Sequence, residues 1–413
     1  MLRRRRTTHL FHLNHLRNFR TPLKRNMSFS SLPLELKEKI LDLLDNESLL
    51  MMQQVSEDWN TSKIQKKVNI CLAEKIEEEY QRSLSIVGLG KHQGQDFLLH
   101  LDTTLNKWIP LSRIPSDLNV KLDGWSPHLH VHGDKIYLVG VLHCHVAVLD
   151  TKTGQWRNLQ ADEDTTPRWG YATAMMGHKL FCFGGQDENG RTLDTVHVLD
   201  TEEDVKGWET VCSMSTAKMS CGVVEHGGKF YIFGGQTEDM EEDHSNHLAS
   251  AEVFDPECNQ WEEIPKMAQA RSMPSVSVVG GKIVVACGFD HEGWVQSAES
   301  FDPETQTWDT LPDMTHLSGK VNSVAHNGVL HVKNGNLPWA EEDIMERFDG
   351  RKWEEVSVTD CGISSMCLVK KEHISALKSR KSSPRPLLMM TGVLAALTGL
   401  GLSLGAIAWL NSY

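Results

Sequence analysis

The pattern most typical of a metal-binding site lies in an acidic stretch, residues 236–250, which reads QTEDMEEDHSNHLAS. Asp239, Asp243 and His247 follow one another at intervals of four residues. Two carboxylates and one imidazole can bind Fe(II) and leave coordination positions open for a substrate. A stretch so rich in Asp and Glu matches such a pattern easily, so we favour the interpretation of a solvated acidic loop.

Histidines form a second candidate cluster. His128, His130 and His132 alternate along the chain, which places them on one face of a strand, and His143 and His145 follow closely. This spacing could hold a metal, although histidines on strand faces and in turns are commoner. The chain offers no nucleophile motif, phosphate-binding loop or paired acid and base. We therefore predict no catalytic residue, no metal site, no cofactor and no enzymatic activity.

Composition and charge exclude other classes. The nine cysteines are scattered, odd in number and without a CxxC pair, which favours reduced thiols in the cytosol over a disulfide framework. Residues 1–26 carry eight Arg or Lys and no acid, although the whole chain has a net charge of −13. The middle of the chain is therefore strongly acidic. Because phosphate contacts need a basic surface, we expect no nucleic acid partner.

The elements that position these residues are repeats. A strand–turn–Trp phrase recurs, most clearly as FDPECNQWEEIPKM at 254–267 and FDPETQTWDTLPDM at 301–314. Its tryptophans are Trp108, Trp156, Trp208, Trp261, Trp308 and Trp353. A period of about 50 residues is typical of a repeat array.

Each repeat contains signals for four short strands. An upstream phrase such as GGKFYIFGG, at 227–235, combines a glycine turn with a β-branched and aromatic strand, as in a hairpin. The strand that ends in Phe-Asp-Pro or Leu-Asp-Thr enters a tight turn. The Trp on the last strand can fill the gap to the neighbouring sheet. Four-stranded units repeated radially make a β-propeller, which leaves few exposed sheet edges.

These repeats resemble the kelch repeat over about residues 84–370. Six tryptophans then imply an all-β, six-bladed kelch β-propeller. The first repeat lacks a strand before its glycine element, and a spare strand, GISSMCLVK at 362–370, follows the last. We expect the spare strand to complete blade one and close the ring. The recurring Trp, Gly and Asp residues are expected to be scaffold. The acidic loop also resembles the ExxxDxxxH iron-binding pattern of plant specifier proteins, with Asp in place of Glu.

A basic residue recurs sixteen residues before the glycine pair of three repeats, as Arg168, Lys218 and Arg271. In similar kelch substrate receptors this position lines the mouth of the central channel and grips target carboxylates. The resemblance therefore implies that these three residues, with Tyr171, bind a substrate. The alternative is that the three cations pair with carboxylates of the propeller itself.

Residues 31–68 have a helical pattern. Pro33 suits a first helical turn, and Leu36, Ile40 and Leu44 recur at intervals of four. We predict three short helices, which cannot bury much core alone and need a partner. The segment resembles an F-box, which docks on the Skp-type adaptor of cullin ubiquitin ligases. The resemblance implies that the adaptor-binding residues are Leu32, Pro33, Ile40, Leu44, Val55 and Trp59.

The two ends carry targeting signals. Residues 387–410 are 24 apolar or small residues without charge, long enough to span a bilayer as a transmembrane tail anchor. Basic residues precede this span, so the propeller is expected on the cytosolic side. The long span weakly favours the endoplasmic reticulum over the mitochondrial outer membrane. The Arg-rich start resembles a transit peptide, but Met27 offers a plainer start, with the preceding stretch as a basic arm.

The predicted fold class is therefore a six-bladed kelch propeller with a three-helix F-box-like segment and one C-terminal transmembrane helix. The predicted domains are a basic disordered arm or targeting extension (1–30), the F-box-like segment with a linker helix (31–83), the propeller (84–370), a basic linker (371–386) and the tail anchor (387–410). We expect a membrane-anchored substrate receptor that binds a Skp-type adaptor, a cullin ligase and an unidentified protein substrate. The alternatives are a tail-anchored kelch scaffold without a ligase role and a metal-dependent kelch enzyme.

Overall fold

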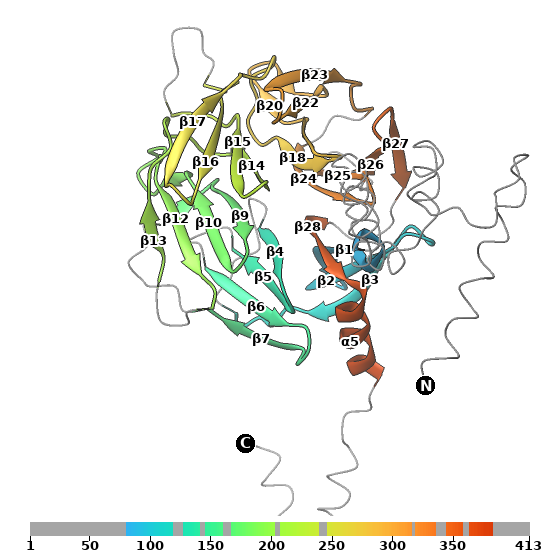
Figure 1. The fold of residues 1–413 in the computed structure, drawn as a ribbon. Helices are drawn as coiled ribbons and strands as arrows, with labels where there is room; N and C mark the ends of the chain where they lie inside the picture. Colours follow the sequence, from blue (N-terminus) through green and yellow to red (C-terminus); the bar gives the residue numbers. More distant parts are fainter. Residues whose placement is uncertain are drawn as a thin grey trace, which may run out of the picture. The chain divides into compact units, whose positions relative to one another are not determined.

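Six four-stranded antiparallel sheets stand around a common axis in the computed structural model of the chain (Figure 1). The structure describes residues 80–118, 127–140, 145–159, 167–202, 207–238, 246–315, 319–335, 344–357 and 363–382. The chain divides into two compact units, Met1–Gln81 and Arg82–Tyr413, and the sheets belong to the second. The prediction of a six-bladed β-propeller is confirmed.

Each blade runs from an inner strand at the axis to an outer strand at the rim. Blade one contains β28 (Ile363–Lys370), β1 (Leu84–His92), β2 (Gln95–Asp102) and β3 (Lys107–Arg113). Blade two contains β4 (His128–His132), β5 (Lys135–Val139), β6 (Val146–Asp150) and β7 (Gln155–Asn158). Blade three contains β9 (Ala172–Met176), β10 (Lys179–Phe183), β12 (Val196–Asp200) and β13 (Glu209–Val211).

The other three blades repeat this order. Blade four contains β14 (Gly222–His226), β15 (Lys229–Phe233), β16 (Ala251–Asp255) and β17 (Gln260–Ile264). Blade five contains β18 (Ser275–Val279), β19 (Lys282–Ala286), β22 (Ala298–Asp302) and β23 (Thr307–Leu311). Blade six contains β24 (Gly319–His326), β25 (Val329–Gly335), β26 (Ile344–Phe348) and β27 (Trp353–Ser357). Two-stranded ribbons join β8 (Arg168–Trp169) to β11 (Gln186–Asp187), and β20 (Phe289–Asp290) to β21 (Gly293–Trp294).

The ring closes as predicted, through the spare C-terminal strand. Strand β28 pairs antiparallel with β1, in a register that places Leu84 opposite Lys370 and Leu89 opposite Ser365. Each of the six inner strands contacts the inner strands of the two neighbouring blades. Blade one therefore joins the two ends of the repeat array into one cooperative unit.

Glycine is required where one blade meets the next. Gly184 has φ +57°, and a Cβ atom there would lie 2.3 Å from the backbone oxygen of Lys218 in the following blade segment. Gly234 repeats the arrangement against Arg271, at 2.2 Å. No side chain fits at such distances, so the recurring glycine pair is explained by close backbone approach.

The repeated tryptophans fasten each outer strand to the preceding blade. The Trp261 ring stacks on Phe254 of its own blade, with centroids 4.8 Å apart, and its Nε1 donates to the carbonyl oxygen of Cys212 in blade three. The indoles of Trp308 and Trp353 donate to the carbonyl oxygens of Pro265 and Pro312 in the same way. Their expected scaffold role is confirmed.

A helix follows the propeller where we predicted a basic linker. Helix α5 (Lys371–Ser382) begins directly after β28 and contacts β28 and β3 of blade one. Ile374 and Leu377 are buried in the core cluster between blades one and two, and His373 Nε2 lies 2.8 Å from Asp134 Oδ1. Two apolar residues three positions apart thus outweigh the basic composition of the segment.

The predicted fold class also included a three-helix F-box-like segment and one transmembrane helix, and this part of the prediction is corrected. Among the described residues, which include helical residues 80–83 and α5, no helix is long and apolar enough to cross a membrane. The predicted span, 387–410, and the predicted three-helix segment, 31–68, both lie outside the described residues. The fold that the structure describes is therefore a six-bladed propeller with α5 at its C-terminal end.

Candidate binding site in the central channel

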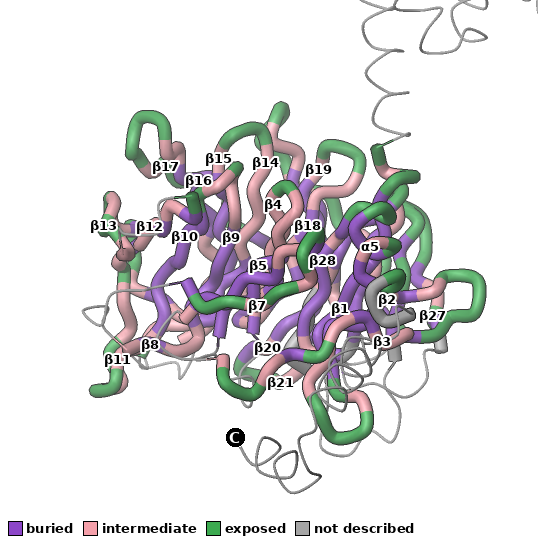
Figure 2. Tube along the Cα trace, turned by 90° about the horizontal axis from the view of Figure 1, so that it is seen from below, coloured by how far each residue is buried: buried purple, intermediate pink, exposed green. Residues whose placement is uncertain are grey.

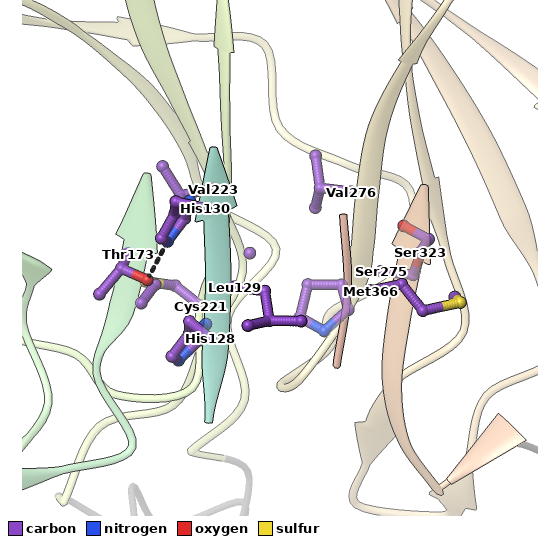
Figure 3. Close-up of a pocket in the computed structure, with 13 residues that line it drawn as sticks. His128, Leu129, His130, Thr173, Cys221, Val223, Ser275, Val276, Ser323 and Met366 are labelled. Carbon is purple, nitrogen blue, oxygen red and sulfur yellow. Dashed lines mark hydrogen bonds between the residues drawn. The ribbon is translucent and has the colours of Figure 1, made fainter. Parts of the chain in front are cut away.

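The six inner strands enclose a cavity of about 200 Å³ on the propeller axis (Figure 3). Every blade contributes to its wall, because the six inner strands surround the axis (Figure 1). The exposed residues lie mostly in the turns at the ends of the strands (Figure 2). The lining residues are His128, Leu129, His130, Ala172, Thr173, Cys221, Gly222, Val223, Pro274, Ser275, Val276, Ser323 and Met366. Most of them stand at the beginning of an inner strand, so the cavity lies toward the end of the channel where these strands start.

Two histidines of β4 form one wall of the cavity. His130 Nε2 lies 2.7 Å from Thr173 Oγ1 on β9, and the His128 ring lies 5.8 Å from the ring of Tyr171. Burial lowers the pKa of His128 to about 4, although a hydrogen bond with the Tyr171 backbone acts in the opposite direction. Burial, and then the neighbouring His128, lower the pKa of His130 to about 3. Both imidazoles are therefore neutral at physiological pH.

Hydroxyl groups line much of the remaining wall. Ser323 Oγ lies 2.8 Å from Ser277 Oγ, which links blades five and six. Ser365 Oγ accepts a hydrogen bond of 3.2 Å from the amide of Leu129. Ser275 is 2% exposed, and within the part of the chain that the structure describes its Oγ has no hydrogen-bond partner. A buried hydroxyl without a partner is costly, so Ser275 marks a place where a ligand group or water belongs.

Three residues with left-handed backbone conformations lie two residues before the inner strands β9, β14 and β18 begin. Gly170, Ser220 and Met273 have φ values of 64°, 55° and 52°. They are joined in series, because the Ser220 amide donates to the Gly170 oxygen and the Met273 amide to the Ser220 oxygen, each at 2.6 Å. A left-handed conformation is unfavourable for Met, and such strain is concentrated at functional sites in many proteins.

The predicted substrate-binding cations lie behind this wall rather than in it. Lys218 Nζ donates to Glu252 Oε1 at 2.6 Å, and Arg271 donates to Glu299 Oε1 at 2.8 Å. Lys218 and Arg271 are 0% exposed. This geometry favours the alternative in which the cations pair with the propeller's own carboxylates, and a substrate-binding role for them stays a prediction.

In blade three a histidine, His197, takes the position that Glu252 and Glu299 have in blades four and five. Arg168 is 3% exposed, donates to the Gly184 oxygen at 3.1 Å, and lies 2.8 Å from His197 Nε2. Tyr171, predicted with the cations, is also buried, and its hydroxyl donates to the Gly140 oxygen. The ring of Tyr171 lies beside that of His128, which lines the cavity.

Sequence reasoning missed the acidic partners of these cations. Glu252, Glu299 and Glu346 occupy equivalent positions in the phrases AEVFD, AESFD and MERFD, and all three are nearly fully buried. Glu252 and Glu346 also accept, at Oε2, from the segment that leads into their own blade: the amide and hydroxyl of Ser215 donate to Glu252, and those of Thr315 donate to Glu346. An acidic residue three positions before the turn Asp in some repeats was the available signal.

The metal patterns find little support in the described ranges. Asp239 and Asp243 lie outside them, as does His143, and His247 stacks edge-on against Phe289 with centroids 5.6 Å apart. Within those ranges no group of three His, Cys, Asp or Glu side chains is arranged to hold a metal ion. His130 instead hydrogen-bonds to Thr173 of β9, and His128 to the backbone of Tyr171 just before β9, which suits a structural or ligand-contacting role.

Comparison with known proteins agrees with this architecture. Residues 29–64 match the F-box domain. Kelch-like protein 26 of Danio rerio is 26% identical over 204 residues, 47% of this chain and 31% of that protein. Beta-scruin of Limulus polyphemus is 29% identical over 45% of this chain and 20% of its own length. An F-box/kelch-repeat protein of Arabidopsis thaliana is 32% identical over 29% of this chain and 27% of its own length.

The chain thus spans about a third or less of the length of these relatives. The propeller itself is covered more fully. Residues 128–335, about half of the chain, match the family described as the KLHDC2/KLHL20/DRC7 Kelch-repeats domain. That match includes five of the six inner strands and the strained residues at the channel end. The chain carries an F-box domain and belongs to this kelch-repeat family.

Proposed function

We propose that this chain is a substrate-recognition adaptor of a cullin-type E3 ubiquitin ligase. The observation that carries the proposal is the presence of an F-box match, at 29–64, and a six-bladed kelch propeller in one chain. The F-box would bind a Skp-type adaptor, and the propeller would bind the target protein. Holding both on one chain raises the effective concentration of target lysines near the ligase.

The chain's own role in this proposal is binding and positioning, not catalysis. The relative from Arabidopsis thaliana combines the same two elements in its name, F-box/kelch-repeat protein, which supports the combination as a functional unit. The cavity on the propeller axis supplies a concave surface suited to part of a target. Ubiquitin transfer would be performed by the other subunits of the ligase.

A kelch interaction scaffold without a ligase role is the second candidate. Glu57 and Asp58 directly precede Trp59, so the F-box match includes two acidic residues next to a predicted adaptor contact. Acidic side chains at the edge of an apolar contact weaken it unless the partner supplies cations. This candidate predicts a folded propeller that binds targets but no Skp-type adaptor.

Adaptor capture separates the two candidates. Pro33→Glu and Ile40→Glu together place two charges on the predicted apolar adaptor face, and we expect them to abolish capture of a Skp-type adaptor from cell extract. Leu105→Glu is the matched control, because Leu105 is 69% exposed in a turn of the propeller. Capture that is unchanged in the double variant, or absent from the unaltered chain, would refute the ligase role.

A further inference from the structure

The cavity on the propeller axis has a chemical character that selects among ligands. None of the described residues that line it is Asp, Glu, Lys or Arg. Its polar groups are hydroxyls, imidazoles and one thiol, and its other groups are aliphatic. A cavity of about 200 Å³ is also far larger than one water molecule, whose share of liquid volume is about 30 Å³.

The charges nearest to the cavity cancel one another. Cys221 lines the cavity and follows Lys218 by three residues. Burial raises the pKa of the Cys221 thiol to about 11, while Lys218 lowers it and Glu252 raises it. The two ions thus act on the thiol in opposite directions, and desolvation dominates. Desolvation at the thiol therefore disfavours a negative charge beside this part of the wall.

The histidines reinforce this selection. Burial lowers the pKa values of His128 and His130 to about 4 and about 3, so the wall that these rings form disfavours a positive charge. A ligand carboxylate or ammonium would lose hydration and meet no partner of opposite charge among the described lining residues, which is unfavourable. An uncharged group with both a donor and an acceptor meets no such penalty.

Ser275 supplies the specific contact. Ser275 lines the cavity beside Val276, and its Oγ, which is buried, lacks a partner among the described residues. Figure 3 places Ser275 and Ser323 on one side of the cavity, and His128, His130 and Thr173 on the other. A carboxamide can accept from a hydroxyl with its oxygen and donate from its nitrogen, so it can use both sides.

We propose that the cavity binds an uncharged carboxamide group, supplied by an Asn or Gln side chain of the target protein. This inference rests on the proposed function for the identity of the partner, but the cavity's preference for an amide does not depend on it. It differs from the sequence-based expectation that the channel grips target carboxylates, since Lys218 and Arg271 are buried in ion pairs.

Saturation-transfer NMR on the full chain tests the preference. Acetamide and acetate have the same size and shape but differ in charge, so they form a matched pair of probes. N-acetyl-Gly-Gln-Gly-amide and N-acetyl-Gly-Glu-Gly-amide repeat the comparison within a peptide. We expect transfer to acetamide and to the Gln peptide that is at least fivefold stronger than transfer to acetate and the Glu peptide. Acetamide binding without Gln-peptide binding would overturn the assignment to a protein side chain.

Two variants locate the binding. Ser275→Ala removes the unpartnered hydroxyl and should reduce transfer to acetamide at least threefold, whereas Ser375→Ala, a control on exposed helix α5, should leave it unchanged. Val276→Phe fills the cavity from the adjacent lining position and should abolish transfer, which keeps the test valid if Ser275→Ala folds poorly. Equal transfer to acetate, or transfer that survives both changes, would overturn the proposal.

The same variants separate this inference from the proposed function. Neither Ser275→Ala nor Val276→Phe changes residues 29–64, so both should capture a Skp-type adaptor as the unaltered chain does. Loss of acetamide preference with intact adaptor capture would sink only the inference. Retained acetamide preference without adaptor capture would sink only the ligase role.

Discussion

Replacing Lys218 by Ala tests whether the blade-start cations serve the fold or a target. Lys218 Nζ and Glu252 Oε1 are 2.6 Å apart, and their side chains are 0% and 2% exposed. Removing the ammonium leaves Glu252 as a buried carboxylate that still accepts from the amide and hydroxyl of Ser215. Breaking a buried pair in this way destabilises proteins by about 3–5 kcal/mol.

An exposed ion pair in the same blade provides a comparison for this loss of stability. Lys229 Nζ lies 3.2 Å from Asp255 Oδ2, and the two side chains are 41% and 26% exposed. Solvent screens such a pair, so Lys229→Ala should cost less than about 1 kcal/mol. The contrast between the two lysines therefore isolates burial, since both variants remove one ammonium from blade four.

Urea unfolding of the full chain, followed by tryptophan fluorescence, measures both variants. The double change Lys218→Met with Glu252→Leu should recover most of the lost stability, because replacing a buried pair by apolar side chains is often neutral. Ser215 is exposed and can then bond to water. Equal and small losses for Lys218→Ala and Lys229→Ala would refute the structural account and favour a target-binding role for Lys218.

Two further predictions concern ring closure and pH. Truncation before Cys361 removes β28 and opens blade one, so the propeller should lose its cooperative unfolding transition, measured by circular dichroism. Truncation after Ser382 should leave that transition unchanged. A truncated chain without β28 that still unfolds cooperatively would contradict ring closure by β28. The folded pKa values of His128 and His130 are about 4 and about 3, below the usual 6.5 of the unfolded chain. Between pH 6.5 and these folded values the unfolded chain therefore binds more protons than the folded chain. Stability should be full above about pH 6.5 and fall as pH drops toward 3, and His130→Gln should flatten that dependence in urea titrations at several pH values.

The repeat tryptophans made the propeller predictable from sequence. Trp261 and Trp308 recur at a fixed distance after Phe-Asp-Pro, and the same phrase in weaker form set the number of blades. Closure by residues 362–370 followed from one missing strand at the start and one spare strand at the end. The number of blades and the closure of the ring could be predicted because both depend on local sequence patterns within each repeat.

The partners of the cations could not be predicted because they depend on pairing across a sheet. Lys218 and Glu252 are 34 residues apart, and their contact requires the inner strand and the third strand of one blade to be placed together. Arg271 with Glu299 and Arg168 with His197 follow the same rule.

Helix α5 was missed for a related reason. Lys371, Lys378 and their basic neighbours suggested a linker, while the apolar signal consisted only of Ile374 and Leu377. Those two residues gain stability from the core cluster between blades one and two, which is a tertiary property. His373 adds a contact to Asp134 that no local pattern announces.

Binding of purified Skp-type adaptor to the purified full chain tests the central claim most directly. Size-exclusion chromatography with light scattering would measure the mass of the complex for the intact chain and for a chain that lacks residues 29–64. A substrate-recognition adaptor predicts a complex of one chain with one adaptor, and no complex after the deletion. An intact chain that elutes alone, or a deleted chain that still binds the adaptor, would contradict the claim.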